Sequence, residues 1–131
     1  MSADTQDVQM TAKIMIVDDE FYISRSLAFM LEKEGFDCST ATDGEEALEM
    51  VSQEKPDIIF LDINMPNKNG YEVCQEIKQN ADTRDIVIIM LTAKGQVEFE
   101  EKSFKAGADD FLLKPYDPNL VMAMIAKHLN S

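Results

Sequence analysis

The stretch Ile58–Pro66 reads Ile-Ile-Phe-Leu-Asp-Ile-Asn-Met-Pro. Its first four residues are large and apolar, which predicts a strand buried on both faces, as in the interior of a parallel sheet. One carboxylate follows, Asp62, and Pro66 then stops the strand because proline has no N–H to donate. A strand of this kind places its terminal acid at the carboxyl edge of the sheet, where ligands bind in open α/β folds. Asp62 is therefore a candidate site residue, although the start of a simple turn would read the same way.

Short apolar runs alternate with amphipathic segments on both sides of this stretch. Further strands are predicted at residues 13–17, 36–41, 86–91 and 110–113, and the run at 36–41 is polar enough to be an edge strand. One helix is predicted to end at Gly35, because apolar residues before it recur at helical spacing. Further helices are predicted over residues 43–53, 71–79, 96–105 and 118–130. Five strands alternating with five helices predict an α/β fold, a doubly wound five-stranded parallel sheet of the flavodoxin-like (βα)5 type.

Several side chains carry more specific expectations. The first helix should turn an apolar stripe inward, made of Ile23, Leu27, Met30 and Leu31, which recur at helical spacing. Phe104 is expected to face inward from the fourth helix. The segment Asp43-Gly-Glu-Glu46 resembles a capping box that opens the second helix.

Length and charge limit the classes of protein. At 131 residues the chain fits one domain, predicted to span 12–131, after a polar tail at 1–11 that is expected to be mobile. The net charge of −13 argues against direct binding of nucleic acid or of an anionic membrane, and favours a basic partner or a metal cation. Two distant cysteines, no long apolar run and no signal peptide favour a cytoplasmic protein.

The predicted strands end on polar residues of complementary types. The first ends on Asp18 and Asp19, the third on Asp62, the fourth on Thr92 and the fifth on Lys114. Parallel strands share one carboxyl edge, so these side chains should converge, although helix-dipole effects would account for one or two of the acids near residue 20. Carboxylates about 4 Å apart repel by roughly 1 kcal/mol in water and about 4 kcal/mol near a protein surface. Hard oxygen ligands without His or Cys predict Mg²⁺, with Mn²⁺ as the alternative.

Four motifs then resemble one family. They are the strand-end Asp18-Asp19, Leu-Asp-x-x-Met-Pro-x-x-x-Gly at 61–70, Met-Leu-Thr-Ala at 90–93 and Gly-Ala-Asp-Asp-Phe-Leu-Leu-Lys-Pro at 107–115. Together and in this order they resemble the receiver domain of two-component response regulators, chemotaxis receivers included. The resemblance covers Lys13 to Asn130 and implies the sheet order 2-1-3-4-5.

The resemblance also implies roles for single residues. Asp62 would be the phosphoacceptor, Asp19 and Asp62 would ligate Mg²⁺ together with the main-chain carbonyl of Asn64, and Asp18 would act through water. Thr92 would donate a hydrogen bond to the phosphoryl group and Lys114 would pair with it. The resemblance further implies a cis peptide bond between Lys114 and Pro115, which is chemically reasonable for an X–Pro bond.

By the same resemblance, four positions would govern signalling and the lifetime of the phosphoryl group. Thr92 would move toward the phosphoryl group, and Phe111, in the aromatic switch position, would turn into the space that it leaves. Because Phe111 lacks the hydroxyl of the tyrosine that is commoner there, it has less reason to stay at the wet surface. Asn64 and Lys94 would tune the lifetime of the phosphoryl group.

The expected function is a signalling switch, not a separate enzyme, that assists only its own phosphorylation and dephosphorylation. The phosphate would come from a histidine kinase or phosphotransfer protein, and the surface of the fourth helix, fifth strand and fifth helix would change to control an unknown protein target. A monomer or weak homodimer is expected, and the absence of arginine from the last helix disfavours receivers that dimerise to drive DNA-binding domains. The alternatives are a Mg²⁺-dependent phosphatase, which usually has an acid where this chain has Asn64, and a flavin binder.

Overall fold

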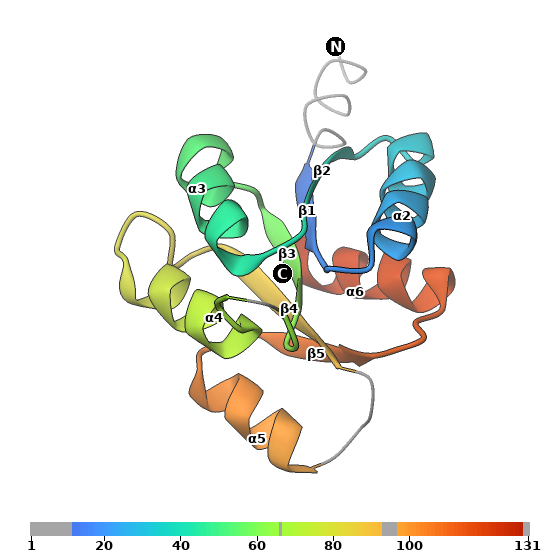
Figure 1. Cartoon of the computed structure of the whole chain (residues 1–131). Helices are drawn as coiled ribbons and strands as arrows, with labels where there is room; N and C mark the ends of the chain where they lie inside the picture. Colours follow the sequence, from blue (N-terminus) through green and yellow to red (C-terminus); the bar gives the residue numbers. More distant parts are fainter. Residues whose placement is uncertain (1–11, 66, 93–96, 130–131) are drawn as a thin grey trace.

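The computed structural model describes residues 12–65, 67–92 and 97–129 (Figure 1). The predicted tail at 1–11 and the predicted tuning residue Lys94 lie outside these residues. In chain order the elements are β1 (Lys13–Val17), α2 (Phe21–Lys33), β2 (Asp37–Ala41), α3 (Gly44–Glu54), β3 (Ile58–Asp62), α4 (Gly70–Gln79), β4 (Val87–Thr92), α5 (Val97–Lys105), β5 (Asp110–Leu113) and α6 (Pro118–Leu129). Across the described residues, none of the helices combines the length and apolar content that a membrane crossing requires.

The five strands form one parallel sheet in the order β2-β1-β3-β4-β5, which confirms the predicted fold and the edge position of β2. The register aligns the strand ends. Val17 pairs with Leu61, Asp62 pairs with Leu91 and Thr92 pairs with Leu113. Residues that follow β1, β3, β4 and β5 therefore emerge along the same edge of the sheet.

Helices cover both faces of the sheet (Figure 1). On one face, α2 and α6 bury Leu27, Leu31, Val121 and Ile125 against the sheet. On the other, α3 and α4 contribute apolar side chains, with Ala106 beyond the end of α5. The whole of β3 is buried. This two-sided burial is what the apolar run of β3 predicts.

Side-chain capping fixes two of the helix starts. Asp43 accepts a hydrogen bond from the backbone N–H of Glu46 at 2.8 Å, as predicted, but the Glu46 carboxylate reaches the N–H of Thr42 at 2.8 Å rather than that of Asp43. At α4 a full capping box joins Asn69 and Glu72. The spacing Asn-x-x-Glu gives the signal for this second box, although the residues between Pro66 and Gly70 suggested only a loop.

Two expectations about inward-facing side chains were wrong. Phe104 is 48% exposed, because the neighbouring Ser103, which is 1% exposed, and Ala106 take the inward positions of that turn. Ile23 is 40% exposed because it stands in the first turn of α2, at the rim of the sheet. Leu27 and Leu31 are buried as predicted, and Met30 is partly buried.

Candidate functional site

The ammonium of Lys114, just beyond β5, is the centre of the candidate site. Its Nζ lies 2.9 Å from Asp18 Oδ2, 3.2 Å from Asp62 Oδ2 and 3.2 Å from Glu20 Oε1. The contact with Asp18 is an ion pair without good hydrogen-bond angles. The three strand ends that carry these side chains lie far apart in the sequence, and the parallel register brings them to one place.

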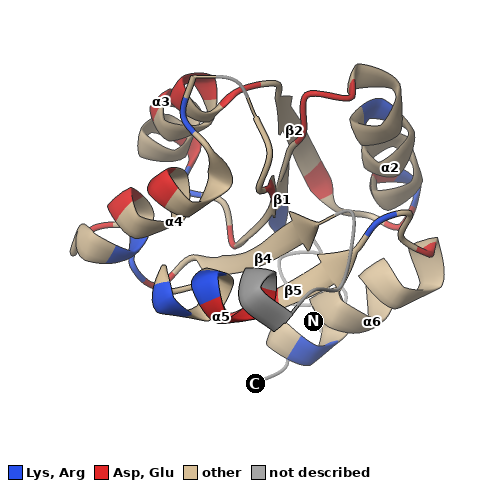
Figure 2. Ribbon diagram, turned by 60° about the horizontal axis from the view of Figure 1, so that its bottom comes forward, with Lys and Arg blue, Asp and Glu red and all other residues tan. Residues whose placement is uncertain are grey.

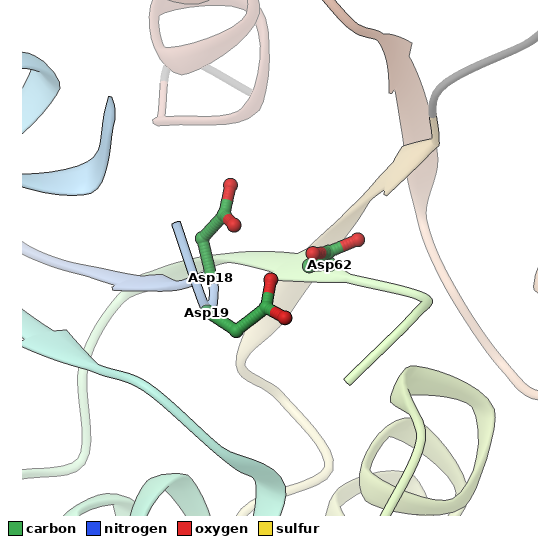
Figure 3. Close-up of side chains that lie close together, drawn as sticks. All are labelled: Asp18, Asp19 and Asp62. Carbon is green, nitrogen blue, oxygen red and sulfur yellow. The ribbon is translucent and has the colours of Figure 1, made fainter. Parts of the chain in front are cut away.

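Three carboxylates form a cluster at this edge of the sheet (Figure 3). One oxygen from each of Asp18, Asp19 and Asp62 can be chosen so that all lie within 4.8 Å of one another. Asp18 is fully buried and Asp62 is 4% exposed, whereas Asp19 is open to solvent. Figure 3 shows the three side chains coming from two neighbouring strand ends into a common space.

The segment after Asp62 is held tightly against the start of α4. The backbone N–H of Asn64 donates to Asp62 Oδ1 at 3.2 Å, and the N–H of Gly70 donates to the carbonyl of Ile63 at 2.9 Å. A Cβ on Gly70 would lie 2.4 Å from the carbonyl oxygen of Asp62 and 2.8 Å from Cα of Ile63. The glycine of the 61–70 motif is thus required by the close approach of two backbones.

Burial and like charge set the protonation of the cluster. Burial, together with the negative charge of the neighbouring Asp18, raises the pKa of Asp62 to about 6, and the ammonium of Lys114 only partly offsets these two effects. Burial would lower the pKa of Lys114, but its contacts with Asp18 and Asp62 outweigh burial and raise that pKa well above its usual range. Lys114 therefore stays cationic, whereas Asp62 carries a costly charge at neutral pH.

Of the remaining predicted site residues, Thr92 is the last residue of β4, 3% exposed, and its carbonyl accepts a hydrogen bond from the N–H of Lys114 at 2.7 Å. Asn64 has an exposed side chain beside Asp62. Phe111 lies apart from the acidic cluster, in β5 opposite Met90 and half-buried. The Lys114–Pro115 peptide bond is cis.

Two residues beside the site were not predicted to take part. Glu20 contacts Lys114, and the run Asp18-Asp19-Glu20 gave the signal for it. Tyr116 follows the Lys114–Pro115 pair, and its hydroxyl is buried without a hydrogen-bond partner among the described residues. Burial, reinforced by the charge of Asp18, raises the pKa of Tyr116 to about 12.

A mainly apolar groove borders the site. One part, with a volume of about 360 Å³, lies between α2 and the start of α6 and is lined by Tyr22, Ile23, Met30 and Tyr116 among others. A second part of about 470 Å³ shares Ile23 and Tyr116 and reaches Lys114. The groove thus runs from the surface of α2 to the ammonium at the centre of the site.

The donor set fits a hard divalent cation. All three clustered side chains offer carboxylate oxygens, and one positive charge from Lys114 faces the negative charges of Asp18, Asp19, Glu20 and Asp62. An oxygen-only set of this kind suits Mg²⁺ or Mn²⁺ and is unsuited to zinc. Among the described residues this is the single group of three or more potential side-chain ligands close enough to hold a metal.

Comparison with known proteins agrees with the geometry of the site. The chain matches the model of the response regulator receiver domain over residues 14–126. It is 44% identical over 91% of its length to a probable transcriptional regulator, ycf27, of Guillardia theta, and 42% identical over 88% of its length to PhoP, the alkaline phosphatase synthesis transcriptional regulatory protein of Bacillus subtilis. These matches cover 46% and 48% of the two relatives, so the chain spans about half the length of each.

The fold agrees with the same family. A crystal structure of a putative response regulator from Chloroflexus aurantiacus superposes with a TM-score of 0.87 at 31% identity, covering 92% of this chain and 99% of that one. The family model spans most of the chain, including every strand end at the acidic cluster. The chain therefore belongs to the response regulator receiver domain family of two-component signal transduction.

Proposed function

We propose that this chain is a phosphorylation-activated signalling switch and that Asp62 is its phosphoacceptor. The observation that carries the proposal is the position of Asp62 at the end of β3, with its carboxylate 3.2 Å from the Lys114 ammonium and within reach of Asp18 and Asp19. The family match supports the same role. No separate catalytic activity toward other substrates is part of the proposal.

In the transfer step, an oxygen of the ionised Asp62 attacks the phosphorus of a phosphohistidine on the donor protein. A P–O bond forms, the P–N bond breaks, and the electron pair leaves with the imidazole nitrogen. Lys114 is placed to pair with the added negative charge, which is about −1.5 to −2 at neutral pH. The buried setting of the site strengthens this interaction and limits the access of water.

Asp19, Asp62 and the main-chain carbonyl of Asn64 would hold Mg²⁺, with Asp18 acting through bound water. When bound, the metal supplies positive charge that offsets repulsion among the carboxylates and among the phosphoryl oxygens. Asp18 would contribute by orienting Lys114, since its fully buried carboxylate lies 2.9 Å from the Lys114 ammonium. The exposed side chain of Asn64, with Lys94, would tune how long the phosphoryl group survives.

The donor would be a histidine kinase or a phosphotransfer protein. The groove along α2 supports this, because it joins exposed apolar surface at Tyr22 and Ile23 to Lys114 at the site. A protein that inserts a phosphohistidine next to Asp62 has to cover this surface. Burial of the exposed apolar side chains would favour that contact.

The output would follow from the movement of two residues. Thr92 would donate a hydrogen bond to the phosphoryl group, and Phe111 would turn inward, which changes the surface formed by α5, β5 and α6. Relatives named as transcriptional regulators support a target in the control of transcription. The excess of acidic residues in this domain (Figure 2) favours a target reached through protein contact rather than through bound nucleic acid. A cytoplasmic location and a monomer or weak homodimer complete the proposal.

The test is transfer from a protein donor. A phosphotransfer domain carrying ³²P-phosphohistidine is mixed with wild type, Asp62→Asn and a matched Asp57→Asn variant, which removes an exposed acid at the opposite end of β3. The proposal is supported if wild type and Asp57→Asn become labelled in the presence of Mg²⁺, and if Asp62→Asn, or wild type with a chelator, does not. Equal labelling of Asp62→Asn contradicts it. Sustained turnover of small phosphate esters would instead favour the phosphatase.

A further inference from the structure

We propose that Phe104 is a positioning residue for Phe111, and that its ring holds Phe111 in the half-exposed orientation until Asp62 is phosphorylated. The inference rests on the proposed switch function of Phe111. It adds a residue that the family motifs do not include. Phe104 lies on α5, and its ring contacts that of Phe111.

The two rings form an edge-to-face pair. Their centroids are 6.1 Å apart and their planes meet at 83°. Aromatic rings favour this T-shaped arrangement because the positive edge of one ring meets the negative face of the other. Phe104 extends from α5 and Phe111 from β5, so the contact joins two of the three elements whose surface is proposed to change.

The short connection between the elements fixes the pair. The N–H of Gly107 donates to the carbonyl of Phe104 at 3.0 Å, and the N–H of Ala108 donates to the carbonyl of Ser103 at 3.0 Å. These bonds end α5 and direct the chain into β5. The N–H of Phe111 donates to Asp110 Oδ1 at 2.9 Å, which leaves the backbone of Phe111 little freedom. Movement of Phe111 is therefore mainly rotation of its side chain.

Packing does not explain why a phenylalanine stands at position 104. The side chain is 48% exposed, and the inward positions beside it are filled by Ser103 and Ala106. A phenylalanine at such a position recovers only part of the free energy of full burial. Among the described side chains, its aromatic contact is with Phe111. A contact that acts on the orientation of Phe111 gives this exposed ring a function.

The direction of the effect follows from the sheet register. Phe111 lies opposite Met90, and Thr92 is two residues further along β4, so Met90 and Thr92 point to the same face of the sheet. Rotation of Phe111 toward Thr92 moves its ring away from α5 and breaks the pair with Phe104. A tyrosine at position 111 has a hydroxyl that favours the wet surface. Phe111 has no hydroxyl, and the contact with the ring of Phe104 instead favours its half-exposed orientation.

The expected size is set by the strength of such pairs. Loss of an edge-to-face contact should change the ratio of half-exposed to inward Phe111 by roughly 2- to 10-fold toward the inward state. Because phosphorylation is proposed to select the inward state, the same factor should appear as tighter binding of beryllofluoride, a phosphoryl mimic, to the variant.

The experiment uses the whole chain labelled with 4-fluorophenylalanine and ¹⁹F NMR, with the Phe111 resonance identified as the one missing from Phe111→Leu. Solvent exposure of that resonance is read from its shift between H₂O and D₂O. Variants are Phe104→Ala, the conservative Phe104→Tyr, and Phe29→Ala, which removes a ring that is 60% exposed on α2, away from Phe111. Thermal unfolding of each variant shows whether it is folded.

The proposal is supported if Phe111 is less exposed in unphosphorylated Phe104→Ala but keeps its wild-type exposure in Phe104→Tyr and in Phe29→Ala. Phe104→Ala should also bind beryllofluoride roughly 2- to 10-fold more tightly. Unchanged exposure of Phe111 in folded Phe104→Ala overturns it. The NMR measurement needs no phosphorylation, so it separates the two proposals. If Asp62 accepts no phosphate but Phe111 still responds to Phe104, the proposed function fails and the positioning role stands.

Discussion

The fully buried carboxylate of Asp18 lies 2.9 Å from the ammonium of Lys114. This pair joins the first strand end to the last and sets the charge balance of the whole site. Lys114 also contacts Asp62 and Glu20, so one cation is shared by three acids. The site is short of positive charge, and several of its properties follow from that shortage.

Removal of the shared cation should destabilise the fold. In Lys114→Ala, Asp18 and Asp62 lose their partner in a buried setting, and breaking a buried pair in this way costs about 3 kcal/mol of the free energy of unfolding. Mg²⁺ should recover part of the loss, because it supplies charge at the same place. Urea unfolding with and without Mg²⁺ measures both effects.

Lys102→Ala, at an exposed lysine of α5, is the control and should change stability by less than about 0.5 kcal/mol. A Lys114→Ala protein as stable as this control would contradict the charge account.

The raised pKa of Asp62 predicts how stability depends on pH. The pKa of Asp62 is about 6 in the folded state against 3.8 for an unperturbed aspartate, so between these pH values the folded state binds more protons than the unfolded state. Stability due to Asp62 therefore falls as the pH rises from about 4 to about 6. Asp62→Asn removes the charge and should be more stable than wild type above pH 6, by on the order of 2 kcal/mol, with a difference that shrinks toward pH 4. Denaturant midpoints of the two proteins across this range provide the measurement, and a constant difference would count against the raised pKa.

Gly70 should tolerate no side chain. The Cβ of Gly70→Ala would lie 2.4 Å from the carbonyl oxygen of Asp62, so backbone must move on one side or the other. We expect a loss of about 1–3 kcal/mol in stability, the usual cost of overpacking, together with slower phosphorylation because Asp62 is displaced. Gly35→Ala changes a glycine far from the site and is the control for phosphorylation rate, since its positive φ of 100° makes it costly for stability alone. Phosphorylation at the wild-type rate in folded Gly70→Ala would contradict this account of the glycine.

The groove along α2 should matter to protein donors and not to small ones. Ile23→Lys places a charge on exposed apolar surface that joins both parts of the groove. Transfer from a phosphotransfer protein should slow by 10-fold or more, which corresponds to a loss of about 1.4 kcal/mol of binding free energy. Phosphorylation by acetyl phosphate should be unchanged. Equal slowing with both donors would show that the substitution damages the site rather than the docking surface.

Much of the fold and site could be predicted from the sequence because both depend on local patterns. The apolar run of β3 and the polar ends of the strands are visible residue by residue, and parallel topology then forces the ends together. The contact of Glu20 with Lys114 was not predicted, because an acid at a helix start has an ordinary explanation in the helix dipole. Only the structure shows that Glu20 faces the lysine.

The exposed positions of Phe104 and Ile23 could not be predicted for a different reason. Apolar spacing assigns a residue to a helix face, but the tilt of the helix and the bulk of its neighbours decide which members of the stripe reach the core. In α5, Ser103 and Ala106 reach it and Phe104 does not. The departures from the apolar pattern fall at the surfaces proposed to meet a donor and to position Phe111.

The most direct test of the central claim is the intact mass of the chain after incubation with acetyl phosphate and Mg²⁺. Wild type should gain the mass of one phosphoryl group, and Asp62→Asn, or wild type with the metal chelated, should gain none. Phosphate on Asp62→Asn at the wild-type level, or no gain by wild type under conditions that phosphorylate an established receiver, would contradict the assignment of Asp62 as phosphoacceptor.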